Sequence, residues 1–394
     1  MAGSVGKKKT ENVDVLIYRY RAFPNEEQRI LFAKTFGCTR YLWNRMLSDH
    51  NELYRVIGKV PNNTPADYKD LDECKWLCEV DSLALANVQL NLDSVFTRFF
   101  NGLAGYPKFK KKGKNDSYTT NVSNKTNPNI SLELDPVRKD TAWLKLPKLK
   151  SRVEIRLHRK IKEGGILKKV CIKKEPDGHY YCSLTFEYPK MTVQKVQRPQ
   201  KDIGLDMKLN GLYMDNEGHC ADIPSFYRQM EKKIARQQRI LSHMKKDSQN
   251  YKKQKQKIAK LHAKTKRQRK DLLDKLSAFL TDTYDRICIE DLDMHAMAQA
   301  LSLGKSVSDN GWGMFARMLQ YKAERKGKWL IKVDRFFPSS KICSVCGHVH
   351  KELQLSDRIY ICPECGNVMD RDHQAACNIL REGIRIWEDA IAMQ

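Results

Sequence analysis

Apolar and polar residues alternate along the chain from Val13 to Phe23. This period of two predicts a β-strand, which Pro24 ends. Asn25 stands three residues before Gln28, a spacing that predicts a capping box at the start of a helix. Apolar residues then recur at helical spacing, so we expect a helical unit over residues 25–104.

The period of two returns between residues 129 and 188. A Glu-Pro-Asp-Gly sequence at 175–178 is typical of a hairpin turn. Together with the first strand, this pattern predicts a small antiparallel β-barrel into which the helical unit is inserted. The predicted strands are Ile130–Leu134, Trp143–Leu146, Val153–Leu157, Ile166–Ile172 and Tyr180–Phe186.

A third unit begins near residue 201, where strands and helices alternate. Its first part predicts two strands between Ile203 and Asp215, with a turn near Asn210-Gly211, and then a basic helical hairpin over 226–283 that breaks at 246–250. The remaining predicted elements are the buried strand Arg286–Glu290, a helix capped by Asp309 and containing Trp312, the strand Trp329–Val333 and a helix from about residue 372. The chain is therefore predicted to be a multidomain α+β protein.

The net charge of the chain indicates the class of its binding partner. The 394 residues include 72 lysines and arginines against 47 acids, a net charge of +25. Such an excess indicates a polyanionic partner, with nucleic acid as the first candidate and a basic surface kept for solubility as the alternative. No apolar stretch approaches the roughly 20 residues of a membrane helix. The polar N-terminus, residues 1–12, lacks the apolar centre of a secretory signal and is expected to be a flexible tail.

Aromatic residues are interleaved with lysines in the connection between the helical unit and the barrel, residues 105–120. Such interleaving suits phosphate contacts combined with base stacking. The candidate nucleic-acid-binding residues are Tyr106, Lys108, Phe109 and Lys110. A solvated basic linker is an equally good interpretation of the same residues.

Two Cys-x-x-Cys-Gly pairs, separated by 15 residues, predict a metal site. Four thiolates at this spacing reach the corners of a tetrahedron about 2.3 Å from Zn²⁺. The predicted zinc ligands are Cys343, Cys346, Cys362 and Cys365. A four-thiolate site has no open position for water, so its role is expected to be structural rather than catalytic. The neighbouring histidines, His348, His350 and His373, are surplus to this set, and disulfides are the alternative use of the cysteines.

Three acids stand where predicted elements end or begin. Asp206 lies on the first strand of the third unit, Glu290 ends the buried strand, and Asp372 lies where the last helix starts. A charged residue that ends a buried strand is costly unless it is paired or binds a metal. Oxygen-only ligation favours Mg²⁺ or Mn²⁺, and two such ions about 4 Å apart support phosphodiester hydrolysis. Asp372 is also a candidate helix N-cap, and the nearby acids Asp202, Asp291, Asp293 and Asp370 offer further alternatives.

The order of these motifs resembles that of the TnpB family, which comprises transposon-encoded RNA-guided DNA nucleases related to the miniature type V CRISPR effectors. The resemblance lies in GLDMKLNGLYMDNEG, ICIEDL, SDNGWGMFARMLQYKAERKG, FFPSSKICSVCG and CPECGNVMDRDHQAACNIL, and in YRAFPNEEQ, TRYLWNRML, YPKFKKKG and WLKLPKLK nearer the N-terminus. It covers nearly the whole chain from about residue 14. The departures are Gln374 in place of the usual Asn, and Met207-Lys208 in place of a small residue.

The resemblance implies a set of domains. Residues 13–24 and 120–200 would form a wedge β-barrel, and residues 25–119 its helical recognition domain. Residues 201–339 and 367–394 would form a RuvC (RNase H-like) domain that is interrupted by a zinc ribbon at 340–366. The catalytic acids would be Asp206, Glu290 and Asp372, which would bind Mg²⁺.

The resemblance also implies the partners: a guide RNA, and a target DNA carrying a short adjacent motif that the protein reads. The expected activity is metal-dependent hydrolysis of DNA, in a prokaryotic cytoplasm or, for a eukaryotic relative, a nucleus. The alternatives are a miniature type V CRISPR effector with the same chemistry, an RNA-guided regulator that does not cut, a transposase and a guide-free zinc-ribbon DNA-binding protein. The three intact acids argue against the regulator.

Overall fold

The computed structural model divides the chain into two compact units, residues 1–191 and 192–394. The second unit thus begins before the predicted boundary at residue 201. Residues 192–200 belong with the second unit because Val196 exchanges backbone and side-chain hydrogen bonds with Gly327 and Trp329. The described residues are 13–58, 60–123, 128–190, 192–208, 211–224, 226–294, 296–297, 311–354 and 356–393, so the predicted tail, residues 1–12, lies outside them.

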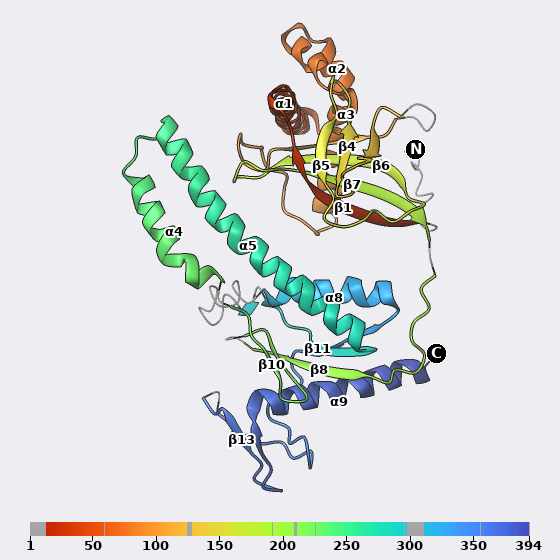
Figure 1. Ribbon diagram of the computed structural model, residues 1–394, viewed down its shortest axis with the longest axis vertical. Coiled ribbons are helices and arrows are strands. Elements are labelled where there is room, and N and C mark those ends of the chain that lie inside the picture. Colours follow the sequence, from red (N-terminus) through yellow and green to blue (C-terminus); the bar gives the residue numbers. More distant parts are fainter. Residues whose placement is uncertain are drawn as a thin grey trace. The chain divides into compact units, whose positions relative to one another are not determined.

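The first unit is built on a seven-stranded antiparallel sheet (Figure 1). The strand order is β2-β6-β7-β1-β5-β4-β3. The predicted strands are confirmed, but the sheet is curled and its edge strands β2 and β3 do not pair in the described residues, so it is not a closed barrel. The strands are β1 (Val13–Phe23), β2 (Ser117–Asn121), β3 (Ser131–Leu134), β4 (Thr141–Lys145), β5 (Val153–Arg156), β6 (Ile166–Lys174) and β7 (Tyr180–Pro189).

The sequence missed some short elements of this unit. Strand β2 begins at Ser117, inside the segment predicted to be helical or connecting. Its exposed and buried residues alternate over only five positions, too few for a clear period. The short helices α2 (Pro65–Asp70) and η1 (Asp72–Glu79) lie within the predicted helical unit, but the sequence did not predict them as separate elements.

Two long helices lie between β1 and β2 in the sequence: α1 (Glu26–Ile57) and α3 (Ser82–Phe100). The predicted capping box is confirmed, because Asn25 and Gln28 exchange hydrogen bonds of 2.9 and 3.0 Å. Phe32 of α1 packs on the inner face of the sheet beside buried tyrosines. The alternation in β1 therefore buries one row of side chains and leaves the other row on the outer face.

The second unit has a five-stranded mixed sheet of order β10-β9-β8-β11-β12, in which β8, β11 and β12 run parallel (Figure 1). Helices α5 and α8 pack on one face through Leu273 and Phe315, and α9 covers the other face through Ile379. The elements are β8 (Asp202–Met207), β9 (Tyr213–Asp215), β10 (Cys220–Ala221), α4 (Phe226–Ser242), α5 (Gln249–Thr283), β11 (Arg286–Glu290), α8 (Trp312–Lys326), β12 (Trp329–Val333), β13 (Ile359–Ile361), β14 (Val368–Asp370) and α9 (Arg371–Ala392).

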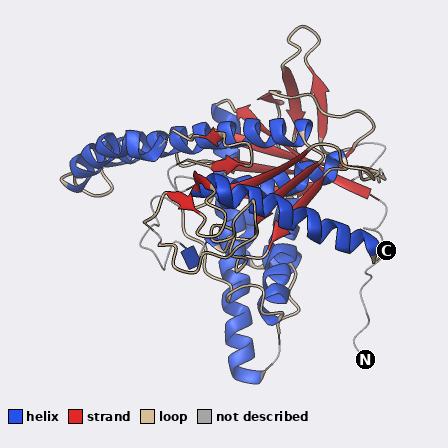
Figure 2. Cartoon of the chain, turned by 90° about the horizontal axis from the view of Figure 1, so that it is seen from below, coloured by secondary structure: helices blue, strands red, loops and turns tan. Residues whose placement is uncertain are grey.

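Helices α4 and α5 form the predicted basic hairpin, which extends away from the sheet of its own unit (Figure 2). Its two helices are joined by a buried hydrogen bond of 3.0 Å from Gln254 Nε2 to Gln237 Oε1. Asp309, the predicted cap of α8, and Asn210, in the predicted turn, lie outside the described residues. No helix in the described part of the chain is both long and apolar enough to cross a membrane.

Strand β8 is buried on both faces, and Gly204 lets α9 approach it closely. A Cβ atom at Gly204 would lie 2.4 Å from the Ala376 carbonyl oxygen and 2.8 Å from the Leu380 backbone nitrogen. Because both of these atoms belong to the α9 backbone, the helix itself has to move to admit a methyl group.

We therefore expect Gly204→Ala to destabilise the second unit by about 1–3 kcal/mol. This corresponds to a fall in melting temperature of about 2–4 °C for each kcal/mol, measurable by calorimetry. Gly105→Ala is the control, because a Cβ atom at Gly105 meets nothing within 4 Å. Equal melting temperatures for the two variants would contradict the close packing of α9 on β8.

Candidate carboxylate centre and cysteine cluster

Two of the three predicted acids lie at the same end of neighbouring parallel strands: Glu290 is the last residue of β11, and Asp206 is the last but one of β8. The last paired residues of β8 and β11 are Leu205 and Ile289, so Asp206 and Glu290 each follow by one residue at the same end of the sheet. The third, Asp372, lies in the first turn of α9, which packs across both strands. All three predicted acids therefore come from elements that meet at one edge of this sheet.

The electrostatics of Asp206 show that the other two acids lie nearby. Burial, and then the negative charges of Glu290 and Asp372, raise the pKa of Asp206 well above its ordinary value. Burial likewise raises the pKa of Glu290. A hydrogen bond of 2.6 Å from Ser339 Oγ to Glu290 Oε1 acts in the opposite direction and lowers this pKa. The three carboxylates do not lie within 4.8 Å of one another, as the ligand atoms of a ready metal site would.

Three of the neighbouring acids have other partners. The N-cap of α9 is Asp370, whose carboxylate accepts hydrogen bonds from the backbone nitrogens of Asp372 and His373 at 2.9 and 3.1 Å. Asp202 pairs with Arg286 at the other end of β8, and Asp291 pairs with Lys332. The side chain of Asp372 is therefore not used as a cap.

Two side chains that the sequence did not single out as site residues contact this group. Lys208 Nζ lies 3.8 Å from Asp372 Oδ2 and 3.0 Å from Cys220 Sγ. The hydrogen bond to Cys220 and the charge of Asp372 raise the pKa of Lys208, which keeps it cationic beside the acids. In the sequence, the one feature that could have identified Lys208 as a site residue was its position two residues after Asp206. For Ser339, the corresponding feature was its position in the Ser-Ser pair that precedes the first cysteines.

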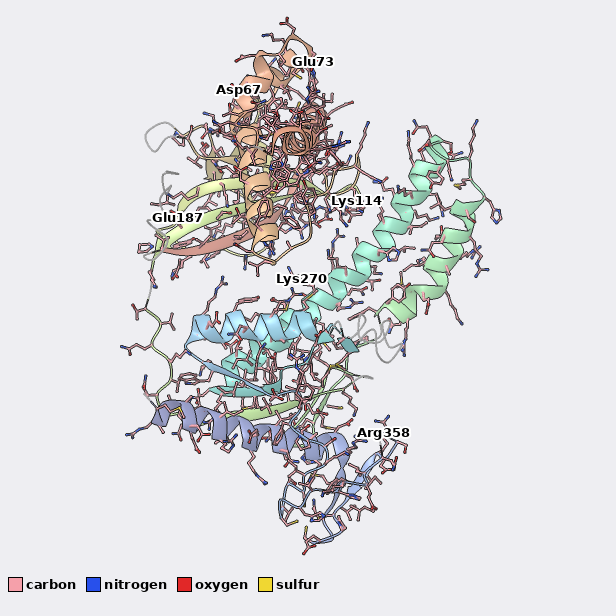
Figure 3. All side chains as sticks on the ribbon, turned by 180° about the vertical axis from the view of Figure 1, so that it is seen from behind. Asp67, Glu73, Lys114, Glu187, Lys270 and Arg358 are labelled. Carbon is pink, nitrogen blue, oxygen red and sulfur yellow. The ribbon has the colours of Figure 1, made fainter. Side chains whose placement is uncertain are left out.

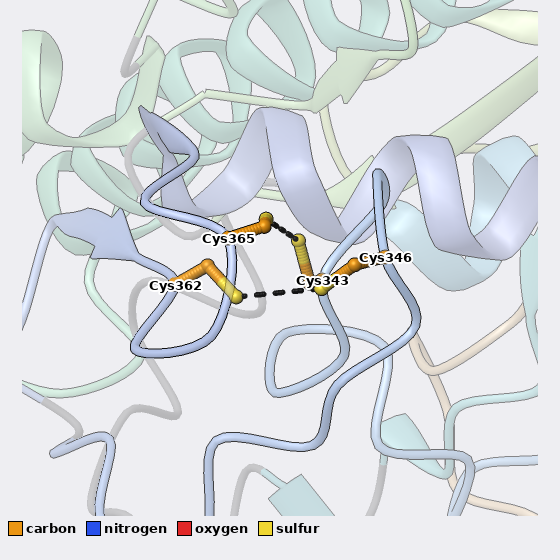
Figure 4. A group of neighbouring side chains, drawn as sticks. All are labelled: Cys343, Cys346, Cys362 and Cys365. Atoms are coloured by element: carbon orange, nitrogen blue, oxygen red, sulfur yellow. Dashed lines mark hydrogen bonds between the residues drawn. The ribbon is translucent and has the colours of Figure 1, made fainter.

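The four predicted cysteines form a compact cluster (Figure 4). Their sulfurs all lie within 4.8 Å of one another, and the Cys343–Cys365 and Cys346–Cys362 Sγ atoms are each 3.6 Å apart. These separations are far longer than a disulfide bond of about 2.05 Å, and all four cysteines are free. The sequence prediction that they converge is confirmed, and the disulfide alternative is wrong.

Two similar turns present the sulfurs. Gly347 N donates to Cys343 O, and Gly366 N donates to Cys362 O, each at 3.0 Å. Both glycines have positive φ, 78° and 69°, a conformation that side chains disfavour. Gln374 of α9 fixes the first turn, because it donates to Ile342 O at 2.6 Å and accepts from Ser344 Oγ at 2.8 Å. Gln374 thus connects the cysteine cluster to the helix that carries Asp372.

The predicted nucleic-acid-binding residues lie in the other unit, on a segment held against α1. Trp43 Nε1 donates to Lys108 O at 3.1 Å, and Asn44 exchanges two hydrogen bonds with the backbone of Lys110. The Lys110 ammonium lies 3.8 Å from the centre of the Trp43 ring. Tyr106 packs on Phe99. Lys108 and Phe109 are exposed. The backbone of this segment is therefore held by α1, while the Phe109 ring faces outward.

Known proteins share this arrangement of elements. Family models described as "Cas12f1-like, TNB domain", "Probable transposase" and "Helix-turn-helix domain" match residues 312–379, 169–301 and 16–59. A protein of Streptomyces pristinaespiralis named "Putative RNA-guided DNA endonuclease" is 30% identical over 375 residues, which cover 93% of this chain and 89% of that protein. The chain belongs to the TnpB family.

Further relatives of this TnpB-family chain span similar lengths. "Putative RNA-guided DNA endonuclease InsQ" of Escherichia coli is 28% identical over 386 residues, covering 93% of this chain and 92% of the relative. A solved cryo-EM structure of the Cas12f1–sgRNA–target DNA complex aligns with a TM-score of 0.54 at 16% identity, covering 89% of this chain and 82% of that one, and so shares its fold. The stretch matched as a helix-turn-helix is a strand followed by one long helix, β1 and α1.

We expect the cysteine cluster to hold one metal ion per chain. Cys343→Ser should lose this ion and loosen the segment 340–370, because two buried and two exposed thiolates share it. Metal content by elemental analysis and limited proteolysis measure the two effects. Cys78→Ser is the control, since Cys78 is exposed and outside the cluster. An unchanged metal content in Cys343→Ser would contradict the assignment.

Proposed function

We propose that this chain is an RNA-guided DNA endonuclease that hydrolyses phosphodiester bonds of target DNA at a RuvC-type site. Asp206, Glu290 and Asp372 would carry the reaction, a guide RNA would select the target, and the protein would read a short motif beside it. The observation that carries this proposal is the placement of Asp206 and Glu290 at the same end of two parallel strands, beside the first turn of α9 that contains Asp372. Relatives named as RNA-guided DNA endonucleases, aligned over nearly the whole chain, support it.

The donor set fits hard divalent cations. Three carboxylates and no sulfur or nitrogen ligand favour Mg²⁺, or Mn²⁺, over zinc. Two such ions, when bound, activate a water and stabilise the leaving oxygen. The raised pKa of Asp206 supports a cation site, because a bound cation would offset both the burial of this carboxylate and the negative charges of Glu290 and Asp372. Ser339 orients Glu290 through its hydrogen bond to Oε1, and Lys208 offsets part of the charge of Asp372.

The cysteine cluster fits zinc. A tetrahedral zinc with bonds of about 2.3 Å places its sulfurs about 3.8 Å apart, close to the observed separations of 3.6 Å. The site would be structural, because four thiolates leave no position for water. Its connection to α9 through Gln374 supports a role in holding the helix that carries Asp372.

The fold also supports the proposed domains. The curled sheet fits a wedge domain, and its helical insertion, α1 to α3, fits a recognition domain. The second unit, with parallel β8, β11 and β12 covered by helices, fits a RuvC domain in two parts, with the cysteine segment between them as a zinc ribbon.

The charge of the α4–α5 hairpin supports polyanionic partners. Between Arg228 and Lys270 there are seventeen lysines and arginines against two acids. Figure 3 shows side chains projecting along both helices, with Lys270 labelled on α5. The charges of a DNA duplex are about 1.7 Å apart along its axis. A nucleic acid lying along the hairpin would therefore bring several phosphates close to these side chains. A miniature type V effector, with a guide from a repeat array, is the second candidate, and the match to the Cas12f1-like family model supports it.

Asp206→Asn should reduce DNA cleavage by at least about 100-fold and leave nucleic-acid binding unchanged. Loss of a residue that only supports a metal ligand already costs about 10–100-fold. The measurement is cleavage of labelled target DNA by the purified protein–guide complex in Mg²⁺, with binding followed separately by gel shift. Asp291→Asn is the matched control, because Asp291 pairs with Lys332 on the surface. If Asp206→Asn cut at the wild-type rate, the assignment would be wrong.

Binding of RNA and DNA should weaken steeply with salt. Each lysine or arginine that neutralises a phosphate releases a counterion, so six to ten contacts lose about 10³–10⁵ in affinity between about 50 and 200 mM salt. Fluorescence anisotropy with a labelled duplex and a labelled single strand gives the slope. An affinity that stays flat over this range would exclude an electrostatic interface.

A further inference from the structure

A cluster of arginines and aromatic rings occupies the exposed face of the curled sheet in the first unit. The alternation in β1 places Arg19, Arg21 and Phe23 on this outer face, opposite the buried row. Antiparallel pairing brings Arg156 of β5 directly opposite Arg21 on one side, and Tyr181 of β7 opposite it on the other. The cluster thus draws on three neighbouring strands and does not depend on a flexible loop.

These side chains surround a pocket of about 420 Å³. The pocket is lined by Arg19, Arg21, Phe23, Arg156, His158 and Tyr181. A volume of this size is in the range of pockets that hold small ligands, about 300–1,000 Å³. Its walls offer guanidinium groups, an imidazole and two aromatic rings, and no acid lines it.

The three arginines of this pocket differ in their ion pairs. Arg21 and Arg156 face each other across the β1–β5 pair, an arrangement of like charges that destabilises a sheet. Arg156 pairs with Asp140 at 3.4 Å and Arg19 pairs with Glu175 at 2.6 Å, but the Arg21 guanidinium forms no ion pair with a carboxylate of the described residues. An anion placed between Arg21 and Arg156 would relieve this repulsion, because a guanidinium pairs with two phosphate oxygens at once.

Aromatic rings stand beside the same guanidinium groups. The Arg19 guanidinium lies 4.1 Å from the centre of the Tyr181 ring, and that of Arg21 lies 5.0 Å from the centre of the Phe23 ring. Phe23 is 41% exposed, so part of its ring is open to a ligand. Aromatic rings on an exposed sheet, together with arginine planes, are the surfaces on which unpaired bases stack.

We propose that this pocket binds one unstacked nucleotide of a nucleic-acid single strand. Arg21 and Arg156 hold the phosphate, and the base stacks on Phe23 or on the Arg19–Tyr181 pair. The site is separate from the carboxylate centre, which lies in the other unit, and it rests on the proposed function only for the source of the strand, the guide RNA or the displaced DNA.

The test measures binding of a fluorescein-labelled 12-nucleotide uridylate RNA and of the matching thymidylate DNA by the full chain. Arg21→Gln should weaken binding of at least one of the two by about fivefold or more, and Phe23→Leu should do the same, since one stacked base contributes about 1–3 kcal/mol. Phe23→Trp, which keeps a stacking ring, should bind like the wild type. A preference for RNA points to the guide, and a preference for DNA points to the displaced strand.

Arg152→Gln is the matched control. It removes the same charge from the same unit, but Arg152 pairs with Glu133 outside the pocket. If Arg21→Gln and Phe23→Leu bound both probes as Arg152→Gln does, while circular dichroism showed them folded, the pocket would not be a nucleotide site. Ultraviolet cross-linking should place uridine on Phe23 or Tyr181, and a cross-link confined to other residues would also overturn the proposal.

The two proposals fail separately. Asp206→Asn should bind both probes as the wild type does, because Asp206 lies outside the pocket. If the wild-type chain cut no DNA but Arg21→Gln weakened oligonucleotide binding, the pocket proposal would stand and the nuclease proposal would be wrong. If the wild-type chain cut DNA but the pocket variants bound both oligonucleotides normally, the nuclease proposal would stand and the pocket proposal would be wrong.

Discussion

The close packing of α9 on β8 is the constraint on which the candidate centre depends. Gly204 lets the helix backbone reach the strand, and Gly383 does the same beside Cys288 of β11. With the helix in this position, its first turn meets the ends of the two parallel strands. Asp372 therefore faces a location defined by Asp206 and Glu290, although more than eighty residues separate each of these acids from the next in sequence.

The same helix connects the centre to the cysteine cluster. Asn378 donates to Ser339 O and Ile342 O at 2.7 and 2.6 Å, while Ser339 donates through its hydroxyl to Glu290. Gln374 holds the first cysteine turn from the same side of α9. One face of α9 thus organises both the cysteine segment and a contact to an acid, so a metal in the cluster would stabilise the surroundings of the carboxylates without taking part in chemistry.

The acids of the candidate centre contrast with the basic character of the rest of the chain. The second unit gathers three acids at one edge of its sheet, where burial, and then the charges of Glu290 and Asp372, raise the pKa of Asp206. Positive charge is in excess over the whole chain, and basic residues cluster in the α4–α5 hairpin, in the segment around Lys108 and in the arginine pocket of the first unit. A concentrated acidic site within a basic protein favours a polyanion that is bound along its length and meets divalent cations at one position.

The sequence by itself determined the features that depend on nearby residues: the Asn25–Gln28 capping box, the alternation of β1 and the convergence of the four cysteines. Spacing encodes these because the interacting groups lie within a few residues or form repeated short turns. Only the tertiary structure decided that Asp370, not Asp372, caps α9, that Lys208 and Ser339 contact the acids, and that Arg21 faces Arg156. These contacts depend on strand register and helix placement, which are set by packing across the whole unit rather than by local spacing.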